Sequence, residues 1–600
     1  WNLTKSLQLD YTALTNAIVD EPEGLIDTQA KKDSIWNNLK NFGRVANFLQ
    51  QVNLTYQLPL DKIPATDWIS GTARYSVGYN WTAGSVLQAD SLGNIASNKQ
   101  EQTLTGKFDF VRLYNKNARL RSINSPTPQR GLPTRGGADN EEEENAGGNS
   151  SNALLRALMS LRTITMNISL DQGTVLPGFL PKPSYFGLDR SLSAPGLGFV
   201  MGSQNLSILN KAVDNGWLGE SSALTNPVSQ YRRVNMNFTA DLEPARDFRI
   251  TLTASKRYDD NYREIFRRDD QQFRTFSPNR FGSYGISIIA IKTAFSSNDE
   301  DNVSGVFRNF EAYRNNILNR LEGEVPGGEL GQNSQDVLIP AFLAAVRGKS
   351  PNNVKLNPFP AIPLPNWSLD FRGLTRIPAL GEKFSSINIS HRYESRYEVG
   401  NFNSSLIYQE DLRLNNRLSN SALPSLTNEE NFLIPLYVMN QVVISERFSP
   451  LIGIDIRTKS QFNINVEYRQ ERNLALSLSN TQITEINRKD FVFDLGYTKA
   501  GIRLPFGIGG ETGTLDNDLT FNVSASIGDT RTYQRQIDNI STITNGNLNF
   551  QIRPNIGYVV NQKLNLQFYF DRIVNEPRIS NSFKRATTSF GVNVRFDLSQ

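Results

Sequence analysis

Residues 71–82 read Gly-Thr-Ala-Arg-Tyr-Ser-Val-Gly-Tyr-Asn-Trp-Thr, and this stretch decides the fold. Successive side chains of a β-strand point to opposite faces. Every second residue from Ala73 to Trp81 therefore lies on one face, which is apolar and largely aromatic. The opposite face carries the polar residues Thr72, Arg74, Ser76 and Asn80. The stretch predicts a strand with one apolar and one polar face, and the polar face is expected to line a lumen.

The same alternation recurs along the whole chain. Apolar residues at period two begin near Ile164, Val234, Phe248, Phe462 and Phe491, and the last sets run through 564–570 and 590–598. We expect about 16 to 18 strands. Many strands of this kind predict an all-β fold, namely a large antiparallel transmembrane β-barrel, or half of one, in an outer membrane.

Composition supports a barrel around a wet interior. Only 38% of residues are hydrophobic, and the mean hydropathy is −0.41. No stretch approaches the roughly 20 apolar residues that a membrane-spanning helix needs. Cysteine is absent, which excludes disulfides and thiolate metal sites. The net charge of +4 is too small to indicate a nucleic-acid partner.

The connections between the predicted strands are unequal in length. The whole chain, 1–600, is expected to be one barrel segment with two long insertions, 173–230 and 259–366. A pair of strands joined by a tight turn separates the insertions, so both should leave on one side, which in bacterial barrels is extracellular. The segment 113–160 should be periplasmic, and its acidic run Glu141–Glu144 is predicted to be disordered.

Short helices are predicted only in the connections. Apolar residues from Val303 to Leu321 recur at helical spacing. Pro340–Val346 and Lys31–Phe42 are two further candidates, each followed by a glycine that favours a helix end. All three are too short and too polar to cross a bilayer. We therefore expect the two insertions to cap the pore, and 173–230 to act as its gate.

No catalytic or cofactor site is evident in the sequence. His391 is the only histidine, and it lies on the apolar side of a predicted strand, where packing is the simpler role. The acidic cluster 298–301 lacks the residue order of a calcium-binding loop. Dispersed Asp and Arg residues in 259–270 are better explained as surface ion pairs than as a hydrolytic pair. We expect no enzyme, no metal and no cofactor.

The stretch from Gly173 to Gln204 combines apolar residues with glycine and proline. Its candidate site residues are Leu176, Pro177, Gly178, Phe179, Pro181, Ala194, Pro195, Gly196, Leu197, Gly198 and Phe199. One interpretation is a compact loop that packs on itself. The other is a gate or a docking surface for a partner. The sequence favours neither.

Several short segments, in order along the chain, resemble a known family. They include residues 32–40, 79–84, 176–181, 194–204, 448–453 and 564–572. Together they resemble the C-terminal part of the SprA/Sov family, the outer-membrane translocon of the type IX secretion system. The chain departs from that family in length.

The resemblance implies a protein-conducting channel through which folded, secreted cargo proteins pass and leave by a lateral opening. It also implies two partners that alternate at the pore, a PorV-type shuttle barrel and a periplasmic plug protein. Lipid or lipopolysaccharide would surround the wall. Because the run from Trp1 already resembles a strand, we expect an N-terminal half of the barrel to be supplied upstream or by a separate chain, rather than closure of the first strand on the last. The alternative function is a TonB-dependent-type nutrient transporter.

Overall fold

A computed structural model describes most of the chain. The described residues are 2–86, 89–124, 155–325, 327–408, 423–502, 517–539, 541–561, 564–579 and 582–596. The acidic run Glu141–Glu144 lies outside them. None of the described helices is long and apolar enough to cross a membrane.

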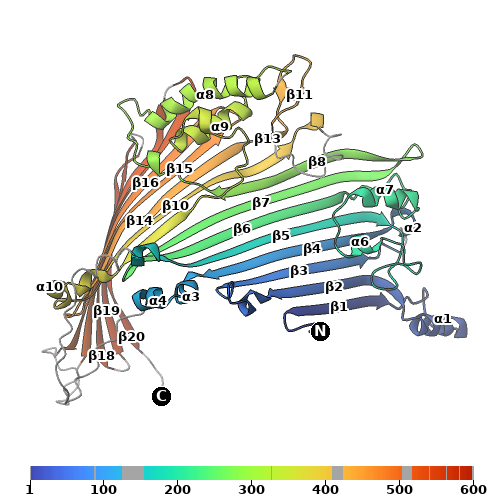
Figure 1. The fold of residues 1–600 in the computed structure, drawn as a ribbon, viewed down its shortest axis with the longest axis horizontal. Coiled ribbons are helices and arrows are strands. Elements are labelled where there is room, and N and C mark those ends of the chain that lie inside the picture. Colours follow the sequence, from blue (N-terminus) through green and yellow to red (C-terminus); the bar gives the residue numbers. More distant parts are fainter. Residues whose placement is uncertain are drawn as a thin grey trace.

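One antiparallel sheet of 18 strands dominates the structure (Figure 1). Its first nine strands are β1 (Leu7–Ile18), β2 (Arg44–Leu58), β3 (Ile69–Thr82), β4 (Asn94–Asp109), β5 (Leu161–Phe179), β6 (Val228–Ala245), β7 (Phe248–Asp269), β8 (Gln272–Ser287) and β9 (Asn366–Phe371). The others are β10 (Phe384–Ser404), β13 (Tyr437–Met439), β14 (Gln441–Thr458), β15 (Phe462–Ser477), β16 (Gln482–Ile502), β17 (Asn517–Gln536), β18 (Ser541–Asn561), β19 (Leu564–Pro577) and β20 (Arg585–Phe596). A separate small ladder joins β11 (Leu426–Thr427) to β12 (Leu433–Ile434). The expected fold class, an all-β antiparallel sheet, and the expected strand number are confirmed.

Strands that follow one another in sequence pair with one another. This meander runs from β1 to β7 and again from β14 to β20. In the middle, β7 pairs with β8 toward one end and with β9 toward the other, and both of these pair with β10. β10 then pairs with β14 and, at its end, with β13. In the meander, connections therefore alternate between the two ends of the sheet. β8 and β9 instead run in the same direction along β7, so the connection between them leaves the sheet between its ends.

The connection 180–227 between β5 and β6 and the connection 288–365 between β8 and β9 carry the longest described helix and five others. We call them cap A and cap B, and the end of the sheet at which they lie the cap end. Cap A contains α6 (Leu197–Val200) and α7 (Ser207–Asp214). Cap B contains η2 (Ile291–Thr293), α8 (Gly305–Glu324), α9 (Gln335–Val346) and η3 (Pro351–Asn353). Figure 1 shows cap A beside the blue-green strands and cap B over the yellow-to-red strands.

The remaining helices lie in other connections. At the cap end are α1 (Gln29–Lys40), α2 (Ala89–Leu92) and η5 (Leu406–Tyr408). At the opposite end are η1 (Pro59–Lys62), α3 (Phe110–Tyr114), α4 (Ala118–Asn124), η4 (Gly373–Arg376) and α10 (Pro378–Gly381). The segment 113–160 therefore leaves from the end opposite to both caps.

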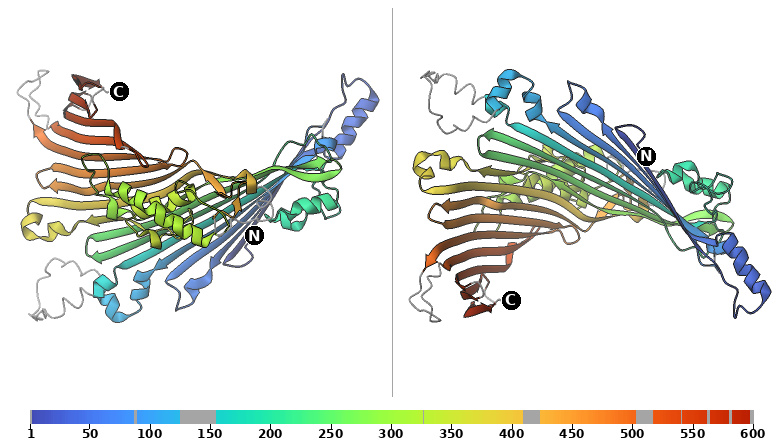
Figure 2. Two further views of the ribbon diagram at one scale, coloured as in Figure 1. Left: turned by 90° about the horizontal axis from the view of Figure 1, so that it is seen from above. Right: turned by 90° about the horizontal axis from the view of Figure 1, so that it is seen from below.

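The sheet is strongly twisted and open (Figure 2). Leu7 of β1 pairs with Tyr56 of β2, and Val594 of β20 pairs with Leu566 of β19. Among the described residues no pairing joins β1 to β20. Each of these two strands thus has a partner on one side only.

Three predicted boundaries are wrong. Residues 173–179 belong to strand β5, and 259–287 form most of the β7–β8 hairpin, so both insertions are shorter than expected. Helix α9 begins at Gln335 and continues through Pro340 rather than starting there. β5 tolerates Pro177 because the pairing with β4 shifts near its end, where Gly178 adopts a φ of +79°.

Candidate functional site

The two faces of the sheet have opposite chemistry. Cross-strand pairs point to the same side, so the face that carries Tyr79 and Trp81 can be followed from strand to strand. Through Phe48, Ala96 and Leu176 it continues onto β2, β4 and β5. We call this the apolar face. The other side, called the polar face, carries the predicted lumen-facing residues Thr72, Arg74, Ser76 and Asn80.

Many charges on the polar face are paired, some across strands, as Arg447 with Glu471, and others within one strand. Four arginines pair with an acid two residues away on the same strand, which places both side chains on one face. The pairs are Arg257–Asp259 at 2.8 Å, Arg396–Glu398 at 2.7 Å, Arg469–Glu467 at 2.5 Å and Arg488–Asp490 at 2.7 Å. The polar face therefore presents local charge pairs among hydroxyls and amides instead of one strong field.

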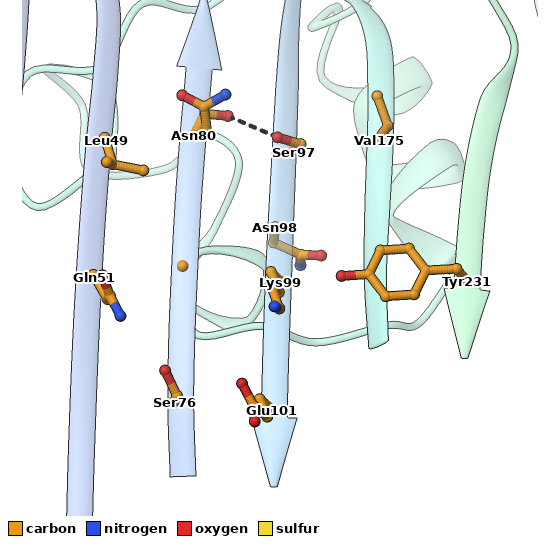
Figure 3. Close-up of a pocket in the computed structure, with 11 residues that line it drawn as sticks. Leu49, Gln51, Ser76, Asn80, Ser97, Asn98, Lys99, Glu101, Val175 and Tyr231 are labelled. Carbon is orange, nitrogen blue, oxygen red and sulfur yellow. Dashed lines mark hydrogen bonds between the residues drawn. The ribbon is translucent and has the colours of Figure 1, made fainter. Parts of the chain in front are cut away.

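A shallow hollow of about 460 Å³ lies on this face over β2 to β6 (Figure 3). Its polar lining includes Gln51, Ser76, Asn80, Lys99 and Glu101. Figure 3 shows their side chains side by side on neighbouring strands, with Tyr231 closing one flank. Ser97 donates a hydrogen bond of 3.4 Å to the Asn80 carbonyl. Among the residues that line the hollow, no nucleophile lies beside a base.

The predicted gate residues form the root and floor of cap A. Leu176, Pro177, Gly178 and Phe179 are the last residues of β5, and Pro181 follows them. Ala194 and Phe199 are buried in the same apolar cluster as Leu176 and Phe179. Leu197 and Gly198 are exposed, Leu197 with 64% of its surface. The Gly/Pro stretch is thus mostly packed against its own sheet.

The alternation on β3 also predicts that Tyr75, Val77, Tyr79 and Trp81 face lipid or a membrane-embedded partner, and for Val77, Tyr79 and Trp81 this prediction is wrong. All three are at most 1% exposed because cap A covers them. The Trp81 indole donates to the Pro181 carbonyl at 3.0 Å, and the Tyr79 and Phe199 rings meet edge to face at 6.3 Å. The cap lies on the apolar face, so it does not close over the polar one.

Asn98 holds the middle of cap A. This amide is 5% exposed and projects from the apolar face of β4. It donates to the carbonyls of Phe199 (2.8 Å) and Ser203 (2.9 Å), and it accepts from the Thr174 amide (3.1 Å) and the Gln204 side chain (3.0 Å). All four hydrogen bonds of the amide are made, which fixes the 194–204 segment on the sheet.

The root of cap A depends on glycines that lack room for a side chain. Gly93 has a φ of +69°, and a Cβ there would lie 2.5 Å from the Gly178 carbonyl carbon. Gly219 donates to the Gly178 carbonyl at 2.8 Å, so the β3–β4 turn, the end of β5 and the end of cap A cross at one point. Backbones can approach this closely only where no side chain intervenes.

Gly93→Ala is expected to loosen cap A, because the new methyl collides with backbone and the positive φ adds strain of about 1–2 kcal/mol. Gly216→Ala is the matched control, since Gly216 also lies in cap A at a φ of +64° but has no neighbour within 4 Å of a built Cβ. Limited proteolysis should cut cap A of Gly93→Ala much faster than that of Gly216→Ala. Equal cleavage rates would show that the crossing does not control the cap.

Cap B packs on the apolar face farther along the sheet. Helix α9 is buried from Asp336 to Val346, and α8 lays Phe310, Ile317 and Leu321 against it and the wall. The wall contributes residues such as Val442, Ile444 and Leu476 to the same cluster. Both insertions were expected to cap the pore; both instead lie on the apolar side of the wall.

Two buried ion pairs anchor cap B to the strands. Arg472 and Glu446, 5% and 2% exposed at the side chain, are 2.7 Å apart, and Arg472 also donates to the Thr293 carbonyl at 2.7 Å. Arg535 and Glu485 are 2.9 Å apart, and Arg535 donates to Asn298 at 3.0 Å. Each pair joins two strands to the start of cap B.

Neither pair is predicted by the sequence. Glu446 and Arg447 are adjacent charges on one strand, and nothing in their local sequence shows which of them is buried. The acidic cluster 298–301 has a structural role here, because Asn298 holds Arg535 and Asp299 accepts from the Val303 amide at 2.7 Å. Within the described residues no three His, Cys, Asp or Glu side chains gather to hold a metal ion.

Two carboxyls in the caps have shifted pKa values. Partial burial opposes ionisation of Asp189, but hydrogen bonds from Ser191, Ala194 and Ser193 outweigh it and hold the pKa of Asp189 below its usual range. Burial in cap B raises the pKa of Asp336 to about 7. Asp189 is thus ionised and turned into its own loop, whereas Asp336 is partly protonated at neutral pH.

Comparisons with known proteins find only distant likenesses. No protein-family model matches the sequence, and no curated protein matches it. A structure of the RagAB peptide transporter aligns at 8% identity, with a TM-score of 0.27, over 90% of this chain and 51% of its own. The siderophore receptor PirA from Acinetobacter baumannii aligns at 7% identity, with a TM-score of 0.26, over 100% of this chain and 75% of its own. The copper transporter OprC aligns at 6% identity, with a TM-score of 0.25, over 99% and 69%.

The chain thus spans about half the length of the RagAB chain that it matches. TM-scores this low carry no argument about function. The structure itself defines an all-β protein, built on one large antiparallel sheet with an apolar and a polar face.

Proposed function

We propose that this chain forms part of the wall of a protein-conducting channel in an outer membrane. The observation that carries the proposal is the uncovered part of the apolar face. Large apolar side chains that are at least 37% exposed lie on it on β2, β4, β14 and β16 to β20, namely Tyr56, Leu104, Ile452, Phe491, Ile527, Ile556, Phe568, Phe590, Val592, Val594 and Phe596. Soluble proteins rarely expose so many large apolar side chains on one face of a sheet.

The height of this surface fits a bilayer. On β16 the apolar residues run from Phe491 to Tyr497, and on β17 from Leu519 to Ile527. At about 3.3 Å per residue these runs measure roughly 20 and 26 Å. The outward apolar band of outer-membrane barrels is about 25 Å tall. We call this surface the lipid belt.

The belt crosses the sheet obliquely, as tilted strands require. One hydrogen-bonded row of the apolar face crosses thirteen strands from Ile69 to Glu576. Its members are Ile69, Phe108, Ile164, Ala240, Leu252, Trp367, Tyr393, Phe448, Gln470, Lys489, Asp529, Leu548 and Glu576. The row is apolar over its first eight members and mostly polar over its last five. If the strands are tilted from the membrane normal, a belt parallel to the membrane contains the first part of this row and not the last part.

Orientation follows from the lengths of the connections. Long loops of bacterial barrels are extracellular, so the cap end is placed outside the cell and α3, α4 and α10 on the periplasmic side. The caps then stand above the belt on the outer side of the wall. The polar face, which neither cap covers, is left for the lumen.

Transport of proteins is supported by the character of the polar face and by the resemblance to the SprA/Sov family. Paired charges and many short hydroxyl and amide side chains give a surface that would bind a transported protein only weakly. The open edges of β1 and β20 would need partners in lipid, because unpaired backbone groups cost several kcal/mol each there. An N-terminal half of the barrel is the proposed partner for both edges, with a PorV-type shuttle barrel and a plug protein acting at the pore.

The second candidate is a nutrient transporter barrel. It would need polar groups that converge on a small solute. Among the described residues, the hollows of the polar face are shallow and lie on a single sheet. This observation favours the channel for proteins.

Photo-cross-linking in secreting cells tests the proposal. A benzophenone amino acid at Asn80, on the polar face, should form adducts with secreted proteins during export. The same group at Ile527, in the lipid belt, should form none. Adducts at neither site, or equally at both, would contradict a protein-conducting polar face, and uptake of a small solute without adducts would favour the transporter.

A further inference from the structure

We infer that residues 182–201 of cap A insert exposed apolar side chains into the outer leaflet of the membrane, where they contact acyl chains. We call this segment the foot. This inference rests on the proposed membrane location of the sheet. It assigns a role to side chains that neither pack in the cap nor belong to the belt.

The foot carries a group of exposed apolar side chains. They are Tyr185 (61% exposed), Phe186 (68%), Leu192 (59%), Leu197 (64%) and Met201 (41%). The rest of the cap buries its apolar residues under α6 and α7. Exposure of five large apolar side chains within 17 residues is therefore a property of this segment, which includes α6, and not of a poorly packed cap.

Contacts place the foot at the upper border of the lipid belt. The Phe186 ring lies 6.2 Å from the ring of Tyr11 on β1, and the Tyr75 hydroxyl on β3 donates to the Met201 carbonyl at 2.8 Å. Tyr11 lies in the register row of Val52 and Val77.

The next rows toward the periplasmic end belong to the belt. One contains Leu9, Leu54 and Tyr75, and the one after it contains Leu7 and Tyr56. Tyr56 is already 37% exposed. The foot therefore lies next to the apolar face, at the register row where the lipid belt begins. Its exposed side chains would contact the same lipid as the belt.

Backbone conformation supports a role for the side chains themselves. Phe186 and Leu192 have φ values of 52° and 58°, a region that bulky residues rarely adopt. Glycine or asparagine would adopt it at lower cost. Both strained positions carry an exposed, large apolar side chain. The backbone turn alone would favour glycine, which indicates that these two side chains have a function.

The charge of the foot fits an anionic leaflet. Lys182 and Arg190 are exposed beside the apolar side chains. The only acid between them, Asp189, accepts hydrogen bonds from Ser193 at 2.8 Å and Ala194 at 3.1 Å inside the loop. Apolar and aromatic side chains flanked by cations are typical of segments that lie in a membrane interface.

Site-directed spin labelling tests the foot. The chain has no cysteine, so each introduced cysteine is unique. Phe186→Cys and Leu197→Cys are labelled in the full protein, with its native partners, in proteoliposomes. Val523→Cys in the belt and Asn80→Cys on the polar face are the reference positions. Power saturation with oxygen, which partitions into lipid, and with a water-soluble nickel chelate gives the environment of each label.

Labels at Phe186 and Leu197 are expected to give oxygen-to-nickel ratios several-fold above that of Asn80 and close to that of Val523. Ratios like that of Asn80 would place the foot in water and overturn the inference. Inaccessibility to both reagents would also overturn it, in favour of a protein partner on the foot. If the label at Val523 gives a ratio like that of Asn80, the proposed membrane location of the sheet is wrong. Failure of the foot and failure of the membrane location are therefore distinguishable.

Discussion

Arg472→Met is expected to detach cap B from the wall and to lower the stability of the cap by about 3–5 kcal/mol. The substitution leaves the Glu446 carboxylate, 2% exposed, without its cation in an apolar cluster. It also removes the hydrogen bonds that Arg472 donates to the carbonyl (2.7 Å) and hydroxyl (2.9 Å) of Thr293, at the point where cap B leaves the wall. Limited proteolysis of residues 288–365 and heat-modified gel mobility give the measurement.

Arg447→Met is the matched control. Arg447 pairs with Glu471 at 3.2 Å, one register row away from the buried pair and on the opposite face. The residue types are the same, but these side chains are 57% and 40% exposed, and exposed pairs contribute about 0–1 kcal/mol. Protease resistance of cap B should therefore stay near that of the unaltered protein. Similar losses in both variants would show that the buried pair does not anchor the cap.

The double variant Glu446→Leu, Arg472→Met separates charge burial from packing. Removing both charges of a buried pair is often far less destabilising than removing one. We expect partial recovery relative to Arg472→Met. Recovery should be incomplete because the Tyr393 hydroxyl, which donates to Glu446 at 2.8 Å, loses its acceptor. A double variant no more resistant than Arg472→Met would show that Arg472 acts mainly through its bonds to Thr293 and not by neutralising Glu446.

Period two predicted the faces of the sheet well where the two faces differ in chemistry. On β16 from Phe491 to Tyr497 the alternation is strict and the strand is easy to find, as expected for a strand between lipid and water. Beyond the belt the same strands continue into water or under a cap, and both faces become mixed. The charged run from Asp259 to Asp269 was for that reason mistaken for a loop, although β7 continues through it.

The chemistry under the caps could not be predicted because it depends on distant pairing. The alternation correctly put Tyr79 and Trp81 on the apolar face, but exposure to lipid requires that nothing else covers that face. The cover comes from residues about 100 positions away, as in the bond from Trp81 to Pro181. Likewise Arg535 is buried through contacts with Asn298, 237 residues earlier. No local pattern carries such information.

Val523→Arg is expected to block assembly of the wall, whereas Asn522→Arg is tolerated. Val523 lies at the centre of the belt on β17, a strand paired on both sides with β16 and β18. Arginine facing lipid near the membrane midplane costs about 2–4 kcal/mol. The neighbouring Asn522 points to the polar face and is exposed there, so arginine at this position remains in water. Heat-modifiable mobility and the amount of protein in outer-membrane fractions give the measurement.

The two substitutions add the same charged side chain to adjacent positions of one strand that point to opposite faces. The added charge is therefore matched, and the medium that it meets differs. A defect confined to Val523→Arg would support lipid on the apolar face and water on the polar one. Defects of equal size would mean that both faces of β17 are packed or that both are in water. The apolar face would then not be a lipid belt, and the proposed membrane channel would lose its main support.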